Sequence, residues 1–382
     1  MRAIDGAIRA KDPSETLQDL LPKLPMMGIT RIANISGLDR LCLPVVACMR
    51  PNAKHVSVSL GKGISVTSAK VSAIMEAVEG YHFENPKESE VTASYRELHH
   101  SQKAVIAPGQ FESNGFLHAG LDEHRTGWVQ ATNLTTSELC LIPHGLTCIA
   151  STKSRKESLI WNITSNGFAA GNTMDEAIIH GIFEVLERHA LYGWSQFSAA
   201  KRDDHLLFDD SVSDEQGSSI LLKLKHAGHL VKIWYLPSLI GHAFQCAIYD
   251  MDMDSPYTVI TGSGAYIDKR VALLRALLEA IQLRVALVSG ARDDIFNAYY
   301  AKQRLMKKVL SQQDVPSLSG VLHFDELGQN QPFDTFAQLK NIVVQKLHHC
   351  GFQVLVCDHT KPEINIPVVQ VFIPGMHFAS RS

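Results

Sequence analysis

The sequence predicts an α+β fold in which mixed or antiparallel sheets are packed against helices. One helix-strand-strand plan occurs twice: a helix that ends at a glycine precedes two strand-like runs, over 220–249 and again over 342–374. Three further segments place a glycine-rich turn before a long apolar helix, over 61–81, 167–188 and 262–284. Helices of this kind bury their apolar surface against sheets, so we expect repeated units of sheet and helix.

Composition limits the classes of function. A chain of 382 residues with 45% hydrophobic and 20% charged residues indicates a globular protein of two packed lobes or one large assembly. The formal net charge of −3 means that the chain has no excess of basic residues, so we expect no nucleic acid partner. No apolar run is long enough to span a bilayer, and 1–17 has no signal-peptide core. We therefore expect no membrane association and a cytoplasmic location.

The seven cysteines include no Cys-x-x-Cys pair and lie mostly in apolar surroundings. This pattern favours reduced core residues over zinc ligands or disulfides. A nucleophilic cysteine needs an activating partner, and the sequence identifies none.

Two regions are expected along the chain. Residues 1–27 are predicted to form an N-terminal helical arm that starts near Ser14 and is stopped by Pro22 and Pro25. Residues 28–382 are assigned to one large domain. Within it the polar passage 201–219 is the candidate for a surface loop between two lobes.

The three apolar helices carry polar residues at matching positions. The spacing i, i+4 and i+7, which places side chains on one helix face, occurs at Ser72, Glu76 and Glu79, at His180, Glu184 and Glu187, and at Arg275, Glu279 and Gln282. A glutamate pair on a helix is ordinarily a solvated face, and Arg275 with Glu279 also suits a buried ion pair. The opposite sides of these helices are apolar as well, which weighs against a solvated face.

If the three polar faces converge, several carboxylates meet Arg188, Arg275 and Lys62 in one site. Burying so many carboxylates without cations is prohibitive, and a divalent metal resolves the conflict. Oxygen ligands with few histidines favour Mg²⁺ over zinc, and Mg²⁺ commonly joins carboxylates to phosphates. Glycine-rich turns at helix starts would add amide donors for a triphosphate, so a nucleotide site follows as a hypothesis. The P-loop, Rossmann and protein-kinase motifs do not occur in the sequence.

The spaced motifs resemble those of the YcaO family, and the resemblance covers the chain from about Gly28 onward. The matching motifs are Gly28-Ile-Thr-Arg with Leu38-Asp-Arg, Gly61-Lys-Gly, Ser72-x-x-x-Glu76-x-x-Glu79, Asn166-Gly-x-Ala-Ala-Gly-Asn172, Glu184-x-x-Glu187-Arg188, Gly262-Ser-Gly followed by Arg275-Ala-x-x-Glu279-Ala-x-Gln282, and Val371-Phe-Ile-Pro-Gly.

The resemblance implies ATP-dependent activation of a peptide backbone amide. A nucleophile adds to the amide carbonyl, ATP phosphorylates the resulting oxyanion, and loss of phosphate gives an azoline, a thioamide or an amidine. Carried over by position, the Mg²⁺ ligands are Glu76, Glu79, Glu184 and Glu187. The nucleotide contacts are Lys62, Ser72, Ser165, Asn172, Arg188, Arg275, Glu279 and Gln282. A helix cap is the alternative role for Asn172, and no general base is evident.

Three departures refine this reading. Many members have Glu-Arg where this chain has Glu79-Gly80, so one basic contact is absent or supplied elsewhere. Azoline-forming members tend to end in a proline-rich tail, whereas this sequence ends Phe378-Ala-Ser-Arg-Ser, and no amino-terminal leader-binding domain is fused to it. These features resemble the stand-alone members that work with a TfuA-type partner. We therefore rank thioamidation of a ribosomally made precursor peptide or a protein first, and azoline or amidine formation second. The resemblance also suggests a homodimer.

Two rival functions remain open from the sequence. One is a non-catalytic ATP-binding accessory factor for ribosomal-protein methylthiolation, and the other is a metal hydrolase that uses clustered carboxylates without ATP. Peptide-dependent ADP release separates an enzyme from an accessory factor, and binding of ATP with Mg²⁺ separates both from the hydrolase.

Overall fold

The computed structural model describes residues 2–4, 7–111, 120–147, 160–161, 163–250, 259–292, 300–301 and 320–378. The chain divides into two compact units. Unit 1 comprises Met1–Asn52, Val56–Ala77 and Ala190–Pro332, and unit 2 comprises Ala53–His55, Val78–His189 and Phe333–Ser382. The expected boundary at 201–219 is therefore wrong, because that passage lies inside unit 1. The division instead falls within two helices, α2 (Val66–Glu84) and α5 (Met174–Ser195).

Unit 1 contains two antiparallel three-stranded sheets in which the strands follow chain order. The first sheet is formed by β3 (Arg31–Asn34), β4 (Val45–Met49) and β5 (Val58–Lys62). The second is formed by β10 (His229–Leu236), β11 (His242–Asp250) and β12 (Val259–Tyr266).

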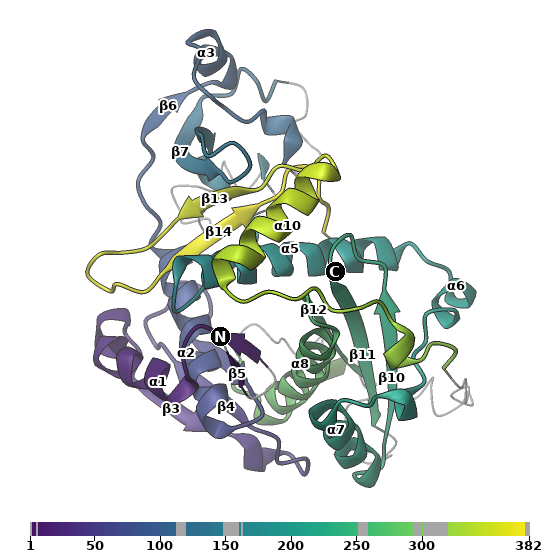
Figure 1. Ribbon diagram of the computed structural model, residues 1–382. Coiled ribbons are helices and arrows are strands. Elements are labelled where there is room, and N and C mark those ends of the chain that lie inside the picture. The colour runs from purple at the N-terminus through teal and green to yellow at the C-terminus, as the bar shows by residue number, and fades with distance from the viewer. Residues whose placement is uncertain are drawn as a thin grey trace. The chain divides into compact units, whose positions relative to one another are not determined.

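Two helices of unit 1 pack against the second sheet. Helix α8 (Lys269–Ser289) contacts β12 and β11, and α7 (Glu215–His226) contacts β10 (Figure 1). The Asp268 carboxylate caps α8 by accepting from the Arg270 amide at 2.9 Å, and Gly290 ends the helix at φ 59°. The unit also contains the short helix α6 (Ala199–Asp203) and the 3₁₀ turns η2 (Ser36–Leu38), η5 (Asp209–Ser211) and η6 (Phe324–Glu326).

The N-terminal arm is helical only in part. Before its helix, strands β1 (Arg2–Ile4) and β2 (Ala7–Arg9) pair antiparallel, which the sequence analysis did not predict. Helix α1 (Pro13–Leu20) then begins after Asp12, whose carboxylate accepts from the Ser14 amide at 2.8 Å, and continues into η1 (Leu21–Met27).

Unit 2 is built on one antiparallel sheet with the order β6-β7-β13-β14-β9, and β8 also pairs with β7. The strands are β6 (Val91–Ala93), β7 (Thr126–Asn133), β8 (Leu139–Pro143), β9 (Phe168–Ala170), β13 (Leu355–Asp358) and β14 (Val368–Phe372). The other elements are α3 (Tyr95–His100), η3 (Pro108–Gln110), η4 (His144–Leu146) and α10 (Phe336–His349). The repeated plan is confirmed, since α7-β10-β11 lies in unit 1 and α10-β13-β14 in unit 2. The predicted fold class is confirmed with it.

Glycines in β5 and β12 let helices lie in contact with strand backbone. A Cβ on Gly61 would stand 2.2 Å from the Ala69 oxygen and 2.0 Å from the Ala73 nitrogen of α2. A Cβ on Gly264 would stand 2.4 Å from the Ala272 oxygen. We call β5 with α2 and β12 with α8 the two strand–helix modules.

The two modules share one register. In each, the strand glycine meets helix residues eight and twelve positions later, which are Ala69 and Ala73 in α2 and Ala272 and Ala276 in α8. The expectation that these glycines form turns is therefore wrong for Gly61, Gly262 and Gly264, all of which lie within strands. Their role is close packing, because a side chain at these positions would overlap the helix backbone.

Helix α5 approaches its sheet through a glycine of its own. A Cβ on Gly181 would lie 2.7 Å from a Val371 methyl and 2.8 Å from the Gly167 oxygen. Gly167 has φ 75°, a conformation that favours glycine. At the start of this helix the Thr173 hydroxyl accepts from the backbone amide of Glu176 at 3.2 Å.

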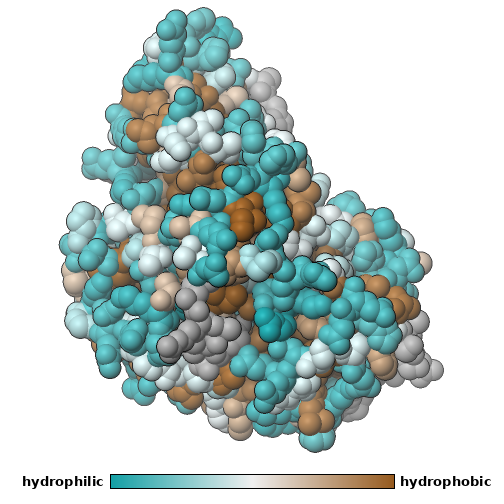
Figure 2. Space-filling model, viewed as in Figure 1, coloured by the Kyte–Doolittle hydropathy of each residue, from teal (hydrophilic) through white to brown (hydrophobic). Residues whose placement is uncertain are grey.

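The core is apolar and contains most of the cysteines. Cys48, Cys140, Cys246 and Cys357 are buried, and burial raises the pKa of each thiol, for Cys48 to about 12. The prediction of core cysteines is confirmed for these four and wrong for Cys42 and Cys350, which are exposed, while Cys148 lies outside the described residues. Hydrophobic residues on the face in Figure 2 form small areas separated by hydrophilic ones. Across the described chain, every helix is too short or too polar to cross a membrane.

Candidate functional site

Four of the predicted nucleotide contacts are linked in unit 1. The Lys62 Nζ lies 3.2 Å from Glu279 Oε2, which joins the end of β5 to α8. The Gln282 Nε2 donates to the Leu60 oxygen at 2.6 Å, and the Lys62 amide donates to Ser72 Oγ at 3.4 Å. Lys62, Ser72, Glu279 and Gln282 therefore form one cluster at β5.

Arg275 lies one turn before Glu279 on α8. Its Nη1 donates to the Ala265 oxygen at 3.3 Å, and its guanidinium stands 4.9 Å from the centre of the Tyr266 ring. Cation–π contact and the backbone bond fix the direction of this side chain. The carboxylate of Glu279 is paired with Lys62. Glu76 is exposed on α2.

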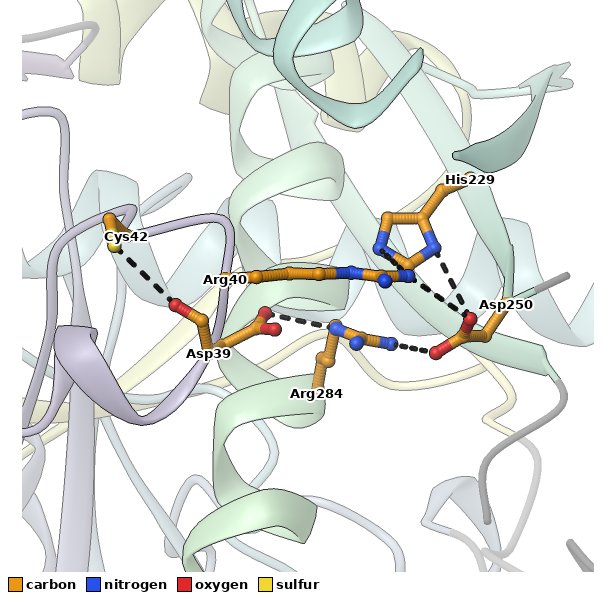
Figure 3. A network of polar contacts seen from close by, with 6 residues as sticks. All are labelled: Asp39, Arg40, Cys42, His229, Asp250 and Arg284. Atoms are coloured by element: carbon orange, nitrogen blue, oxygen red, sulfur yellow. Dashed lines mark hydrogen bonds and ion pairs between the residues drawn. The ribbon is translucent and has the colours of Figure 1, made fainter. Parts of the chain in front are cut away.

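A buried ion-pair network anchors the end of α8. Arg284 lies between two carboxylates: its Nε donates to Asp39 Oδ2 at 2.9 Å and its Nη1 to Asp250 Oδ2 at 2.7 Å (Figure 3). Arg284, Asp39 and Asp250 are each 5% exposed. Arg40 reaches Asp250 Oδ1 at 3.4 Å, and His229 lies beside the same oxygen. Burial, reinforced by Arg284, lowers the pKa of His229.

In unit 2, two predicted residues lie around β9. The Glu79 Oε1 accepts from the Ala170 amide at 2.7 Å. The Asn172 side-chain Nδ2 donates to Glu176 Oε2 at 3.1 Å, and the backbone N–H of Asn172 donates to the same oxygen at 3.2 Å. Asn172 is thus oriented by a carboxylate that is only 2% exposed.

Helix α5 carries the other acidic residues of the predicted site. Glu187 is 8% exposed, Glu184 is half-buried, and the Arg188 Nη1 lies 3.8 Å from Glu187 Oε1. Ser165 is exposed in the segment before β9.

Glu176 is a residue of this region that the family motifs do not include. The sequence carries a signal for it, since Glu176 stands four positions before His180 and extends the polar face of α5.

The donor set fits Mg²⁺ in its chemistry. The predicted ligands are all carboxylates, the oxygen donors that Mg²⁺ prefers. Within the part of the chain that the structure describes, no three His, Cys, Asp or Glu side chains are grouped so as to hold a metal. Mg²⁺ is usually bound by one or two carboxylates together with substrate phosphates and water, so a preformed protein cage is not required.

This is an α+β protein in which an ammonium, a carboxylate, a hydroxyl and an amide side chain gather at β5, and such a set of polar groups can bind phosphate together with Mg²⁺. Residues 60–377 match the family described as YcaO cyclodehydratase, ATP- and Mg²⁺-binding. The chain belongs to the YcaO family, and thus to a group of ATP-dependent, cyclodehydratase-like proteins that modify peptides.

Two relatives are similar over nearly their whole length. An uncharacterized protein of Methanothermobacter thermautotrophicus is 31% identical over 381 residues, covering 97% of this chain and 96% of the relative. An uncharacterized protein from the tfuA 3′ region of Rhizobium leguminosarum bv. trifolii is 28% identical over 390 residues, covering 96% of this chain and 88% of the relative.

Solved structures share the fold at lower identity. The YcaO protein of Methanopyrus kandleri bound with AMPPCP and Mg²⁺ is 23% identical, with a TM-score of 0.74 over 97% of this chain and 93% of that one. A heterocyclase in complex with substrate and cofactor is 20% identical, with a TM-score of 0.78 over 97% of this chain and 53% of that one. The predicted family is confirmed by the family match, and the fold by these structures.

Proposed function

We propose that this protein uses Mg–ATP to phosphorylate the oxygen of a peptide backbone amide and so converts that amide to a thioamide. The observation that carries the proposal is the common i, i+4, i+7 spacing of polar residues on α2, α5 and α8, in a chain of the YcaO family. At these positions α2 and α5 have carboxylates that can bind metal, and α8 has a guanidinium, a carboxylate and an amide that can bind a nucleotide.

Each predicted residue has a role in this proposal. Glu76, Glu79, Glu184 and Glu187 hold the metal. Bound Mg²⁺ neutralises charge on the phosphates during transfer. Arg188, Arg275 and Lys62 supply positive charge to the phosphates, while Glu279 and Gln282 orient the nucleotide and Ser72, Ser165 and Asn172 donate hydrogen bonds. Phosphoryl transfer depends mainly on positioning and electrostatic stabilisation, which these side chains can provide.

Thioamide formation is favoured over the other products by one relative. The Rhizobium protein comes from the tfuA 3′ region, which supports a TfuA-type partner for the present chain as well. In this reaction a sulfur nucleophile adds to the amide carbon and phosphate leaves with the former amide oxygen. Azoline and amidine products arise when a side-chain nucleophile or an amine takes the place of sulfur. We further propose a homodimer, which light scattering after size-exclusion chromatography tests.

Calorimetric titration with ATP in the presence of Mg²⁺ tests the nucleotide site. We expect binding that Glu184→Gln and Glu187→Gln each weaken by about tenfold or more, since each removes one metal ligand. Glu15→Gln on the exposed face of α1 is a matched control. Absence of ATP binding, or equal affinity in all four proteins, would contradict the proposal.

The product identifies the reaction. The peptide encoded beside the gene is incubated with the protein, its TfuA-type partner, a sulfide source and Mg–ATP. A mass gain equal to replacement of oxygen by sulfur supports thioamidation, while loss of water indicates an azoline. ATP binding without peptide-dependent ADP release would instead support a non-catalytic accessory role.

A further inference from the structure

Arg275 of α8 lies against three successive residues of β12. Its Cβ is close to Gly264, because a Cβ added to that glycine would stand 2.6 Å from it. Its Nη1 donates to the Ala265 oxygen at 3.3 Å, and its guanidinium carbon stands 4.9 Å from the centre of the Tyr266 ring. The base, one terminal nitrogen and the guanidinium carbon of this side chain are thus each placed by a different residue of the strand.

Tyr266 is itself held in place. It is only 2% exposed, and it lies on the same face of β12 as Gly264, since alternate residues of a strand share a face. Its backbone pairs with His242 of β11, and a Cβ added to Gly241 would stand 2.5 Å from the Tyr266 oxygen. The half-buried Arg275 therefore lies against a fixed aromatic ring, and attraction between a cation and a ring strengthens as water is removed.

The other strand–helix module provides an internal comparison. Counted from the strand glycine, Arg275 corresponds to Ser72 of α2, and Tyr266 corresponds to Gly63. In both modules the backbone of the residue after the glycine bonds to this helix side chain: the Lys62 amide donates to Ser72 Oγ at 3.4 Å, at the position where β12 accepts from Arg275. An aromatic ring is thus present where the helix carries a long cation, and a glycine where it carries a short hydroxyl.

We propose that Tyr266 is a positioning residue for Arg275, whose guanidinium its ring holds ready for the phosphates of the nucleotide. An arginine side chain has several rotatable bonds, and immobilising it on binding lowers affinity. A guanidinium that the ring already holds loses less freedom when the nucleotide binds. The assignment of Arg275 to the nucleotide rests on the proposed function, whereas the support of Arg275 by the ring rests on the contacts between β12 and α8.

Fluorination tests the ring with little change in its size. Tyr266→Phe keeps the ring, and phenylalanine with one, two or three ring fluorines at this position then withdraws negative charge from the ring face in steps. Calorimetric titration of the full chain with Mg–ATP should show affinity that falls with each fluorine, by about fivefold or more over the series. The same residues at Phe244 are the matched control and should leave the affinity unchanged, since this buried ring of β11 lies beside the rings of Tyr235 and Phe324.

Repeating the series with Arg275→Met separates support of the cation from a general effect on packing. Without the guanidinium, fluorination at Tyr266 should no longer change the affinity for Mg–ATP. The same decline in this background, or constant affinity across the series when Arg275 is present, would overturn the inference. If Arg275→Met binds too weakly to measure, the series with Arg275 present decides alone.

The wild-type titration distinguishes this inference from the proposed function. A wild-type protein that binds no Mg–ATP would contradict the proposed function and the inference together. Wild-type binding with constant affinity across the fluorine series would overturn the role of Tyr266 alone.

Discussion

The two strand–helix modules of unit 1 share one packing arrangement but carry different chemistry. Counted from the strand glycine, Ser72, Glu76 and Glu79 of α2 stand at the same positions as Arg275, Glu279 and Gln282 of α8. One helix is therefore acidic on this face, and the other combines a cation, a carboxylate and an amide. The comparison teaches that the backbone contact sets where side chains stand, while the side chains alone decide whether a helix serves metal or nucleotide.

The modules also differ in how the helix is anchored. Twenty positions after the glycine, α8 has Arg284 in a buried ion-pair network, whereas α2 has the half-buried Tyr81. Helix α2 is held in part by Arg50, whose Nη1 donates to the Ala77 oxygen at 3.4 Å. Substitutions at equivalent positions of the two modules should thus disturb the packing of helix on strand equally, but should differ in the charges that they remove.

The largest effect is expected at the strand glycines. Gly61→Ala and Gly264→Ala place a Cβ within 2.4 Å of helix backbone atoms, so each should lower the free energy of unfolding by more than about 4 kcal/mol, measured by urea denaturation. Gly193→Ala, on α5 with open space around it, is the control and should stabilise by about 0.5–1 kcal/mol. If only one of the two variants is strongly destabilised, the two modules do not depend equally on their backbone contacts.

Arg284→Met should be the next most damaging change. It removes the cation that joins the buried Asp39 and Asp250 and leaves Asp250 only the longer contact with Arg40, which costs about 3–5 kcal/mol in chemical denaturation. Arg270→Met removes an ion pair whose arginine is exposed, and Asp268 keeps its backbone hydrogen bond, so this change should cost less than about 1 kcal/mol. Adding Asp39→Asn and Asp250→Asn to Arg284→Met should recover part of the loss. Equal costs for the two arginine variants would show that the network does not anchor α8.

The chemical difference between the modules can be tested by titrating Mg²⁺. Glu76→Gln should raise the Mg²⁺ concentration for half-maximal ATP turnover by about tenfold, since it removes a proposed metal ligand. Glu279→Gln, at the equivalent position of α8, should raise the KM for ATP and leave the Mg²⁺ requirement unchanged. If both variants shift the Mg²⁺ requirement alike, the assignment of separate roles is wrong.

The smallest effect concerns the sheet on which α5 packs. His359 is buried against Phe168 of β9, with ring centres 4.8 Å apart, and burial together with the nearby charge of Lys87 lowers its pKa to about 3. In the unfolded chain the His359 imidazole binds a proton below its ordinary pKa of 6.5, whereas in the folded chain it stays neutral down to about pH 3. The unfolded state is therefore favoured increasingly as pH drops from 6.5 toward 3, and stability falls over this range. From pH 6.5 to 5 the loss is about 2 kcal/mol. His359→Phe should reduce this pH dependence of the unfolding free energy, while His55→Phe, on an exposed site, should not.

The fold class, the family and the repeated plan could be predicted because they depend on local periodicity and ordered motifs. The glycines were misread because a strand glycine and a turn glycine look alike in sequence. A strand glycine is distinguished by its contact with helix residues eight and twelve positions later. In the sequence this contact is indicated only by small residues at those positions, which are Ala69 and Ala73 in α2 and Ala272 and Ala276 in α8.

Other features depend on distant pairs. Arg284 and Asp39 are 245 positions apart, and nothing local marks either as the partner of the other. The division between the units was missed because it falls inside α2 and α5, where composition does not change.

Helix contact through backbone atoms also bears on how this chain tolerates substitution. Where bulky side chains separate a helix from a sheet, a change in one of them can move the helix and the functional groups on it. At Gly61 and Gly264 the distance between strand and helix is instead set by main-chain atoms. Substitutions in the surrounding core should therefore leave the polar faces of α2 and α8 in place.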